Sequence, residues 1–194
     1  VKGKHGFDDD AFLQHIANLK TMRDTFGDLH EVEAVKAAKR FGAVLASHDD
    51  TTEDQVAVSA AHGIRLAEFP TTVEAARACH AHDIQVMMGA PNLIRGGSHS
   101  GTVAAQELAE LDLLDIVSSD YVPAALLLAA ARLGEIWGDM ARGLATVTSA
   151  PAKAVGLEDR GRLEIGKRAD LIRFAMRAGV PALQGVFARG QRVA

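Results

Sequence analysis

The sequence predicts an α/β fold built on a parallel sheet, and three observations support this. Short apolar runs that do not alternate with polar residues recur at a regular spacing. Helical patterns separate them, as the crossovers between parallel strands require. Polar clusters follow the apolar runs, at the points where the strands would end. Buried parallel strands joined by helices are therefore the expected core.

Two helices are expected before the first strand. Acidic residues at Asp8–Asp10 are typical of a helix start, and an apolar spacing close to that of a helix continues to Phe26. Gly27 is expected to stop this helix, and a second one should run from about Leu29 to Arg40.

Four strand-and-helix pairs should follow. The strands are expected at Ala43–Ala46, Ile64–Glu68, Ile84–Met88 and Leu114–Val117. The helices are expected at Glu53–Ala61, Val73–His82, Thr102–Leu111, and from Pro123 to about Val155 with a break near Gly138. The sequence from 1 to 155 should therefore hold the parallel part of the fold.

The composition changes after Gly156. Residues 156–172 are rich in turn-forming residues and then become strand-like, and 184–193 resemble a hairpin around Arg189-Gly190. These short strands do not continue the parallel pattern. Residues 156–194 are expected to form a small β-module, a β-sandwich, beside the α/β part.

The polar clusters should gather at one edge of the sheet, because ligands bind at the carboxyl ends of parallel strands. Among them, the run Gly89–Gly101 is rich in glycine and lies between an apolar strand and a helix. Its donors suit a phosphorylated or otherwise anionic small molecule. They are Arg95, Ser98, His99 and Ser100. Asn92 either orients the substrate or shapes the turn after Pro91.

Five further residues at strand ends are candidates. His48 can bind a metal, and Asp49 and Asp50 can orient it or cap the next helix. Asp120 can bind a metal and accept a proton from attacking water, or cap the Pro123 helix. Glu68, a carboxylate at a buried strand end, needs a partner, which could be a metal, the substrate or an arginine.

Composition excludes several classes of function. The chain has 194 residues, 48% of them hydrophobic, and a formal net charge of −4. This acidic balance argues against nucleic acid as a partner. No apolar run is long enough to span a membrane, and a single cysteine, Cys79, indicates a reducing compartment. We therefore expect a soluble, cytoplasmic protein that binds a small molecule.

Four strand-and-helix units cannot close a barrel, so either the sheet is open and doubly wound or the first half of a barrel is absent. Several segments resemble those of a known family, and this resemblance favours a barrel that lacks its first half over an open sheet. They are Ala46–Asp50, Glu68–Thr72, Gly89–Gly101, Ser118–Tyr121 and the tail Gly161–Leu171. In this order they resemble the C-terminal half of the amidohydrolase-superfamily diphosphatases of phosphonate breakdown.

The resemblance implies strands five to eight of a (β/α)₈ metal-dependent hydrolase barrel. It also implies release of pyrophosphate from a ribose 5-triphosphate that bears a 1-phosphonate, with a divalent metal, zinc or else manganese or magnesium. His48 and Asp120 would be the metal ligands, and Asp120 also the catalytic base. Asn92, Arg95, Ser98–Ser100 and Glu68 would contact the substrate, with Asp49 and Asp50 behind His48.

The sequence departs from the superfamily at two places. The His-rich motif that follows the first strand is not present, and Glu68 stands where many amidohydrolases have a metal-binding histidine. Another amidohydrolase activity, of a deaminase or cyclic amidase, is an alternative, as is an inactive half barrel that serves only in binding or assembly. The chain alone is expected to be inactive, and it could form a homo-oligomer.

Overall fold

The computed structural model describes residues 6–97 and 101–194, which fall into two compact units, Val1–Val44 and Leu45–Ala194. The first unit consists mainly of one helix, α2, over Asp9–Phe41. Asp8 caps its start by accepting a hydrogen bond from Ala11 N, and Gly42 ends it in a left-handed conformation at φ 62°.

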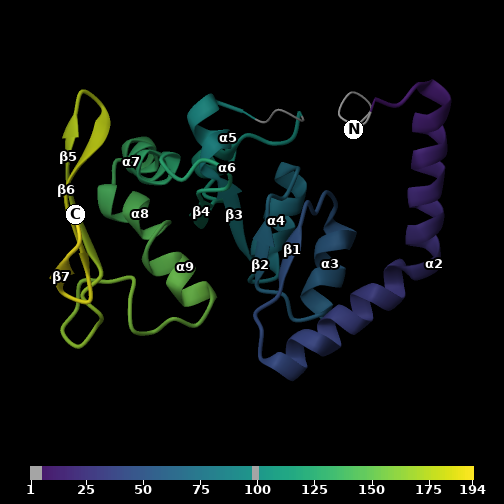
Figure 1. Cartoon of the computed structure of the whole chain (residues 1–194), viewed down its shortest axis with the longest axis horizontal. Helices are drawn as coiled ribbons and strands as arrows, with labels where there is room; N and C mark the ends of the chain where they lie inside the picture. The colour runs from purple at the N-terminus through teal and green to yellow at the C-terminus, as the bar shows by residue number, and fades with distance from the viewer. Residues whose placement is uncertain (1–5, 98–100) are drawn as a thin grey trace. The chain divides into compact units, whose positions relative to one another are not determined.

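The prediction of two helices here is wrong, because the helix continues through Gly27. One glycine inside a helix costs only about 1 kcal/mol, and it ends a helix only where capping groups accompany it. Figure 1 shows that α2 nevertheless bends about half-way along its length.

The second unit contains a parallel sheet with the order β1-β2-β3-β4. Its strands are β1 Ala46–His48, β2 Leu66–Glu68, β3 Gln85–Gly89 and β4 Ile116–Ser118. This confirms the expected α/β class with a parallel sheet (Figure 1). The sequential order lacks the reversal that defines a doubly wound sheet and matches a continuous stretch of a (β/α)₈ barrel. The half barrel itself stays a prediction.

Each strand begins later in the sequence than predicted. The predicted run Ala43–Ala46, for example, overlaps β1 only at Ala46, since Ala43 N still bonds to Ala38 O at the end of α2. Burial also differs among the strands. Both faces of β2 and β4 are largely buried, whereas Ala46 and His48 of β1, at the edge of the sheet, are exposed.

Four helices accompany the strands: α3 Glu53–Ala61, α4 Val73–Ala81, α5 Ala90–Arg95 and α6 Ala105–Glu110. Thr52 and Thr72 cap α3 and α4 with their side chains, and α3 has a full capping box with Gln55. The helix α5 corrects the expectation of one continuous loop from Gly89 to Gly101. Pro91 favours its first turn, and Gly96 ends it at φ 78°.

The core lies between this sheet and its helices. Its fully enclosed side chains include Val56, Cys79, Ile84, Val86, Leu93, Leu108 and Leu133. Burial raises the pKa of the Cys79 thiol to about 12, and the charge of Asp50 adds to this effect. Cys79 is therefore a packing residue and not a nucleophile.

Three helices follow β4: α7 Ala125–Trp137, α8 Met140–Ala145 and α9 Ser149–Ala154. The predicted break at Gly138 is confirmed, with φ 63°, and a second break precedes α9. Val117 N of β4 donates to Thr146 O, so the segment after α8 covers part of this edge strand.

The C-terminal strands form an antiparallel sheet of the order β5-β6-β7, with β5 Leu171–Arg177, β6 Val180–Ala188 and β7 Gln191–Arg192. The expected turn at Arg189-Gly190 joins β6 to β7. The compact units divide at residue 44. A domain boundary at 155 and a β-sandwich over 156–194 stay predictions. No helix among the described residues is long and apolar enough to cross a membrane.

Candidate functional site

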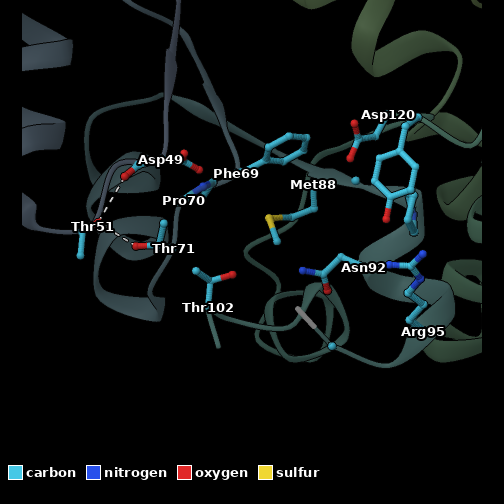
Figure 2. Close-up of a pocket in the computed structure, with 14 residues that line it drawn as sticks. Asp49, Thr51, Phe69, Pro70, Thr71, Met88, Asn92, Arg95, Thr102 and Asp120 are labelled. Atoms are coloured by element: carbon cyan, nitrogen blue, oxygen red, sulfur yellow. Dashed lines mark hydrogen bonds between the residues drawn. The ribbon is translucent and has the colours of Figure 1, made fainter. Parts of the chain in front are cut away.

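A cavity of about 390 Å³ lies at the carboxyl edge of the parallel sheet (Figure 2). The loops after β1, β2 and β4 contribute to its wall, together with the end of β3 and the helix α5. Its lining residues are Asp49, Thr51, Phe69, Pro70, Thr71, Met88, Gly89, Pro91, Asn92, Arg95, Gly97, Thr102, Asp120 and Tyr121. The strand register explains this convergence, because His48 pairs with Glu68, Glu68 with Met87 and Gly89 with Ser118.

Three of the strands end in a left-handed backbone conformation at residues other than glycine. Asp49 follows β1 at φ 61°, Phe69 follows β2 at φ 57° and Asp120 lies two residues after β4 at φ 48°. Such a conformation costs about 1–3 kcal/mol at a residue that is not glycine. Strain of this kind tends to concentrate at functional sites. All three of these residues line the cavity.

At the end of β3 the backbone comes close to two of these residues. A Cβ atom placed on Gly89 would lie 3.4 Å from Asp120 Oδ2 and 3.5 Å from Phe69 Cε1. An alanine side chain at Gly89 would therefore reach van der Waals contact with the Asp120 carboxylate. A larger side chain at Gly89 would extend into the cavity beside it.

His48 and Asp49 are held together at the end of β1. His48 Nδ1 lies 3.0 Å from Asp49 Oδ2, and the His48 ring meets the Phe69 ring edge to face at 5.4 Å. The second ring nitrogen, Nε2, is then the one oriented for a ligand. His48 is 56% exposed in its side chain and is not among the residues that line the cavity, whereas Asp49 is.

Asp50 differs from its neighbour. It is buried, with 9% of its surface exposed, and its Oδ2 is a buried atom without a hydrogen-bond partner. Its backbone carbonyl accepts a hydrogen bond from Thr71 N and so ties the loops after β1 and β2 together. The two aspartates predicted to act together behind His48 therefore lie in different environments, and only Asp49 contacts His48.

A chain of hydroxyl groups on one wall of the cavity was not predicted. Thr71 Oγ1 donates to Thr51 Oγ1 at 2.8 Å, and Thr51 Oγ1 donates to the Asp49 carbonyl at 3.2 Å. Figure 2 shows Thr51 and Thr71 close to Asp49. The signal in the sequence is the repeated Thr-Thr after β1 and β2, in which the second threonine caps a helix and the first faces the cavity.

The opposite wall of the cavity carries a positively charged side chain, that of Arg95. Arg95, in the last turn of α5, has its guanidinium 5.6 Å from the centre of the Tyr121 ring. Figure 2 shows Arg95 and Asp120 on one side of the cavity and Asp49 on the other. The cavity therefore has a hydroxyl-rich wall and a wall with an arginine, an aromatic ring and a carboxylate.

Asn92 lines the cavity, but its amide group also has a structural function. Its Oδ1 accepts from Ala105 N, the first amide of α6, and its Nδ2 donates to the carbonyl of Val103. One donor at the start of α6, which the sequence suggested for anion binding, is thus already satisfied. Glu68 ends β2 half-buried, in register with His48, and Ser98, His99 and Ser100 lie outside the described residues.

The donor set at this edge fits part of a metal site. His48 and Asp120 are of the right chemical type, yet the described residues contain no group of three His, Cys, Asp or Glu placed to hold a metal ion. A catalytic zinc normally has three protein ligands. The described part of the chain therefore does not form a complete site of that kind.

The comparisons with known proteins agree with the fold. An uncharacterized protein of solved structure superposes with a TM-score of 0.62 at 19% identity, covering 82% of this chain and 47% of its own. A prolidase complexed with N-methylphosphonate-L-proline gives 0.61 at 20% identity and the same coverage, and a molinate hydrolase gives 0.57 at 14% identity. At such identities the likeness concerns the fold alone. No family model matches the chain.

A curated relative is far closer in sequence. Alpha-D-ribose 1-methylphosphonate 5-triphosphate diphosphatase of Escherichia coli (strain K12) is 50% identical over 152 residues, which make up 77% of this chain and 40% of the relative. The chain therefore spans less than half the length of this relative. The resemblance drawn from the sequence is confirmed, and over these residues the chain is a homologue of part of that diphosphatase.

Proposed function

We propose that the chain forms part of a hydrolase that releases pyrophosphate from α-D-ribose 1-methylphosphonate 5-triphosphate. The observation that carries this proposal is the 50% identity to a diphosphatase named for that substrate. The cavity supports it independently, because it combines an arginine, a carboxylate and several hydroxyl groups at the edge of the sheet where ligands bind.

In this proposal Asp120 is the general base. Water attacks the α-phosphorus, the bond from this phosphorus to the bridging oxygen breaks, and pyrophosphate leaves. The carboxylate of Asp120 takes the proton of the attacking water. Asp120 suits this role because it lines the cavity and lies on the same wall as Arg95.

Arg95 binds oxygens of the phosphate or phosphonate groups, since a guanidinium is a planar donor that matches them. The ring of Tyr121 helps to hold the guanidinium toward the cavity. Thr51 and Thr71 lie on the wall opposite Arg95, where their hydroxyl groups can hydrogen-bond to the hydroxyl groups of the ribose. Ser98, His99 and Ser100 remain proposed substrate contacts on the basis of the sequence.

A divalent cation, zinc or else manganese or magnesium, belongs to the same proposal. His48 and Asp120 are its ligands from this chain, with Asp49 orienting His48 through the contact at 3.0 Å. Because the described residues supply no third ligand of this type, further ligands must come from outside them. Glu68, which pairs in register with His48, is proposed to contact the substrate.

The test uses a chimera in which residues of this chain replace the matching 152 residues of the E. coli relative. The chimera should release pyrophosphate from the ribose triphosphate, and Asp120→Asn should reduce kcat by about 100-fold or more, as expected for loss of a general base. Asp83→Asn is the matched control, since Asp83 is also an exposed aspartate with left-handed backbone, at φ 56°, but precedes β3 at the other end of the sheet.

Asp83→Asn should leave kcat close to that of the unaltered chimera. Circular dichroism shows whether each variant is folded. A folded Asp120→Asn variant with normal pyrophosphate release would overturn the assignment of the base. A folded, unaltered chimera that hydrolyses cyclic amides or deaminates nucleosides but spares the triphosphate would overturn the proposed activity.

A further inference from the structure

The hydroxyl groups of Thr51 and Thr71, on the hydroxyl-rich wall of the cavity, have hydrogen bonds of fixed direction. A carbonyl oxygen can only accept, so Thr51 uses its single hydroxyl hydrogen in the 3.2 Å bond to the Asp49 carbonyl. Thr51 Oγ1 must then accept in its 2.8 Å contact with Thr71 Oγ1, and Thr71 uses its own hydroxyl hydrogen there. The remaining lone pairs of Thr71 Oγ1 are therefore available to a ligand only as acceptors.

The backbone of this wall, formed by Asp49, Thr51 and Thr71, uses its donors inside the protein as well. The three amides bond to oxygen atoms at 2.7 to 3.0 Å: Asp49 N to Glu68 O, Thr51 N to Gln55 Oε1 and Thr71 N to Asp50 O. Pro70, the lining residue next to Thr71, has no N–H group. The described residues of this wall therefore offer a ligand acceptors but no hydrogen-bond donor.

Thr71 is held in place by its backbone on both sides. Its amide donates to Asp50 O and its carbonyl accepts from Val103 N, each at 2.9 Å. The loops after β1 and β2 and the segment before α6 therefore meet at this residue. Its side chain is half-buried and lines the cavity. A ligand thus meets an acceptor whose position and direction are set before binding, which lowers the cost of ordering it.

The charge on this wall is negative. Asp49 lines the cavity, whereas Arg95 is the only cation among the described residues that line it. Figure 2 shows Asp49, Thr51 and Thr71 on one side of the cavity and Arg95 on the other. Phosphate and phosphonate oxygens are negatively charged acceptors, so the hydroxyl-rich wall offers them neither a donor nor a cation. A neutral group that donates a hydrogen bond, such as a sugar hydroxyl, fits this wall.

We propose that the hydroxyl-rich wall binds only ligand groups that donate hydrogen bonds, and that Thr71 is a specificity-determining residue that accepts one from a hydroxyl group of the sugar. The proposed function supplies the identity of the ligand, on which this assignment rests. The wall then fixes the orientation of the substrate, with a sugar hydroxyl at Thr71 and phosphate or phosphonate oxygens toward Arg95. A sugar that lacks this hydroxyl loses the hydrogen bond and binds more weakly.

The test is the binding of sugar phosphates to the 194-residue chain, measured by NMR chemical-shift titration. The probes are methyl α-D-ribofuranoside 5-phosphate, whose ring cannot open, and its 2-deoxy and 3-deoxy forms. At least one deoxy form should bind about 5-fold more weakly, the effect of one hydrogen bond at a half-buried group. In Thr71→Val, which keeps a similar shape without an acceptor, this difference should vanish. Thr71→Ser keeps the hydroxyl group and should retain it.

Two further variants serve as control and as a test of orientation. Thr148→Val is the matched control, because Thr148 Oγ1 also donates to a backbone carbonyl, that of Leu144 at 2.8 Å, but Thr148 does not line the cavity. It should leave all three affinities as they are in the unaltered chain. Arg95→Gln should weaken all three sugars by the same factor, since each carries the phosphate, and the preference for the hydroxyl should persist.

Circular dichroism verifies that each variant is folded. A chain that binds the three sugars equally well, or binds none of them, would overturn the proposal. It also fails if folded Thr71→Val keeps the preference, or if Arg95→Gln abolishes it. Failure of the proposed function gives a different result: the chimera with the E. coli relative would release no pyrophosphate, while the 194-residue chain would still distinguish the sugars.

Discussion

At the scale of single residues, the strand ends combine cavity-lining side chains with strained backbone. Asp49, Phe69 and Asp120 adopt left-handed conformations after three of the four parallel strands, β1, β2 and β4. Each of them turns the chain sharply away from its strand and contributes a wall of the cavity. The identity of Asp120 as a strand-end carboxylate could be predicted from the sequence, but its left-handed backbone could not, because aspartate adopts this conformation in only a minority of cases.

A histidine that links neighbouring elements, His80, lies at the opposite end of the parallel sheet. His80 Nε2 is 2.8 Å from Asp115 Oδ2, and the same oxygen accepts a hydrogen bond from Val86 N. The pair thus connects α4 with β3 and with the residue before β4. The hydrogen bond with Asp115 favours the charged ring and raises the pKa of His80 above its ordinary value of 6.5.

This shift predicts how stability changes with pH. Because the folded pKa of His80 is raised, its contribution is fully present below pH 6.5 and is lost as the pH rises through the folded pKa. His80→Gln should therefore lower the free energy of unfolding more at about pH 5.5 than at about pH 8.5. Urea unfolding at both values measures this difference.

His82→Gln provides the control for this measurement, because His82 is an exposed histidine two residues away. It should leave the pH dependence of stability as it is in the unaltered chain. Equal losses at both pH values in His80→Gln would show that the hydrogen bond to Asp115 does not depend on the charge of the ring.

At the scale of elements, two glycines control how closely α7 and α8 pack. A Cβ atom on Gly143 would lie 2.4 Å from Ala130 O and 2.5 Å from Gly134 N, both of them backbone atoms. Neither atom can move without moving α7. The absence of a side chain at Gly143 is therefore required by the contact between the two helices and not by its backbone conformation.

Gly143→Ala should consequently lower the free energy of unfolding by about 3 kcal/mol, at the upper end of the cost of overpacking. Gly27→Ala in α2 should have the opposite sign. Its Cβ would meet only the flexible Arg23 side chain, at 3.3 Å, and alanine favours a helix by about 1 kcal/mol over glycine. Urea unfolding checks the first effect and helix content by circular dichroism the second. A neutral Gly143→Ala would show that α8 can shift away from α7.

At the scale of the whole molecule, the chain has one edge of a binding site and two metal-ligand candidates. We expect the 194-residue chain alone to bind zinc weakly and to release no pyrophosphate, because His48 and Asp120 are fewer than the three ligands of a catalytic zinc. Equilibrium dialysis against zinc, with metal analysis of the protein, measures this. Tightly held zinc in stoichiometric amount would contradict it.

The sequence by itself determined the α/β class, the order of strands and helices in the second unit, and the edge where the polar residues gather. It could do so because a buried parallel strand requires an uninterrupted apolar run, and because the crossover between two parallel strands requires a helix-length segment between them. The sequence also predicted the relationship to the E. coli diphosphatase, through motifs such as Ala46–Asp50 that keep their order along the chain.

Only the tertiary structure decided which of these residues share a cavity. It placed Asp49 in the wall but Asp50 in the interior, it joined Thr71 to Thr51, and it brought Tyr121 under Arg95. These contacts join segments from different strands, and neither apolar spacing nor capping residues carry information about distances between such segments. At Gly27 local propensity predicted a helix end, and α2 continues instead because a single glycine without capping groups costs a helix only about 1 kcal/mol.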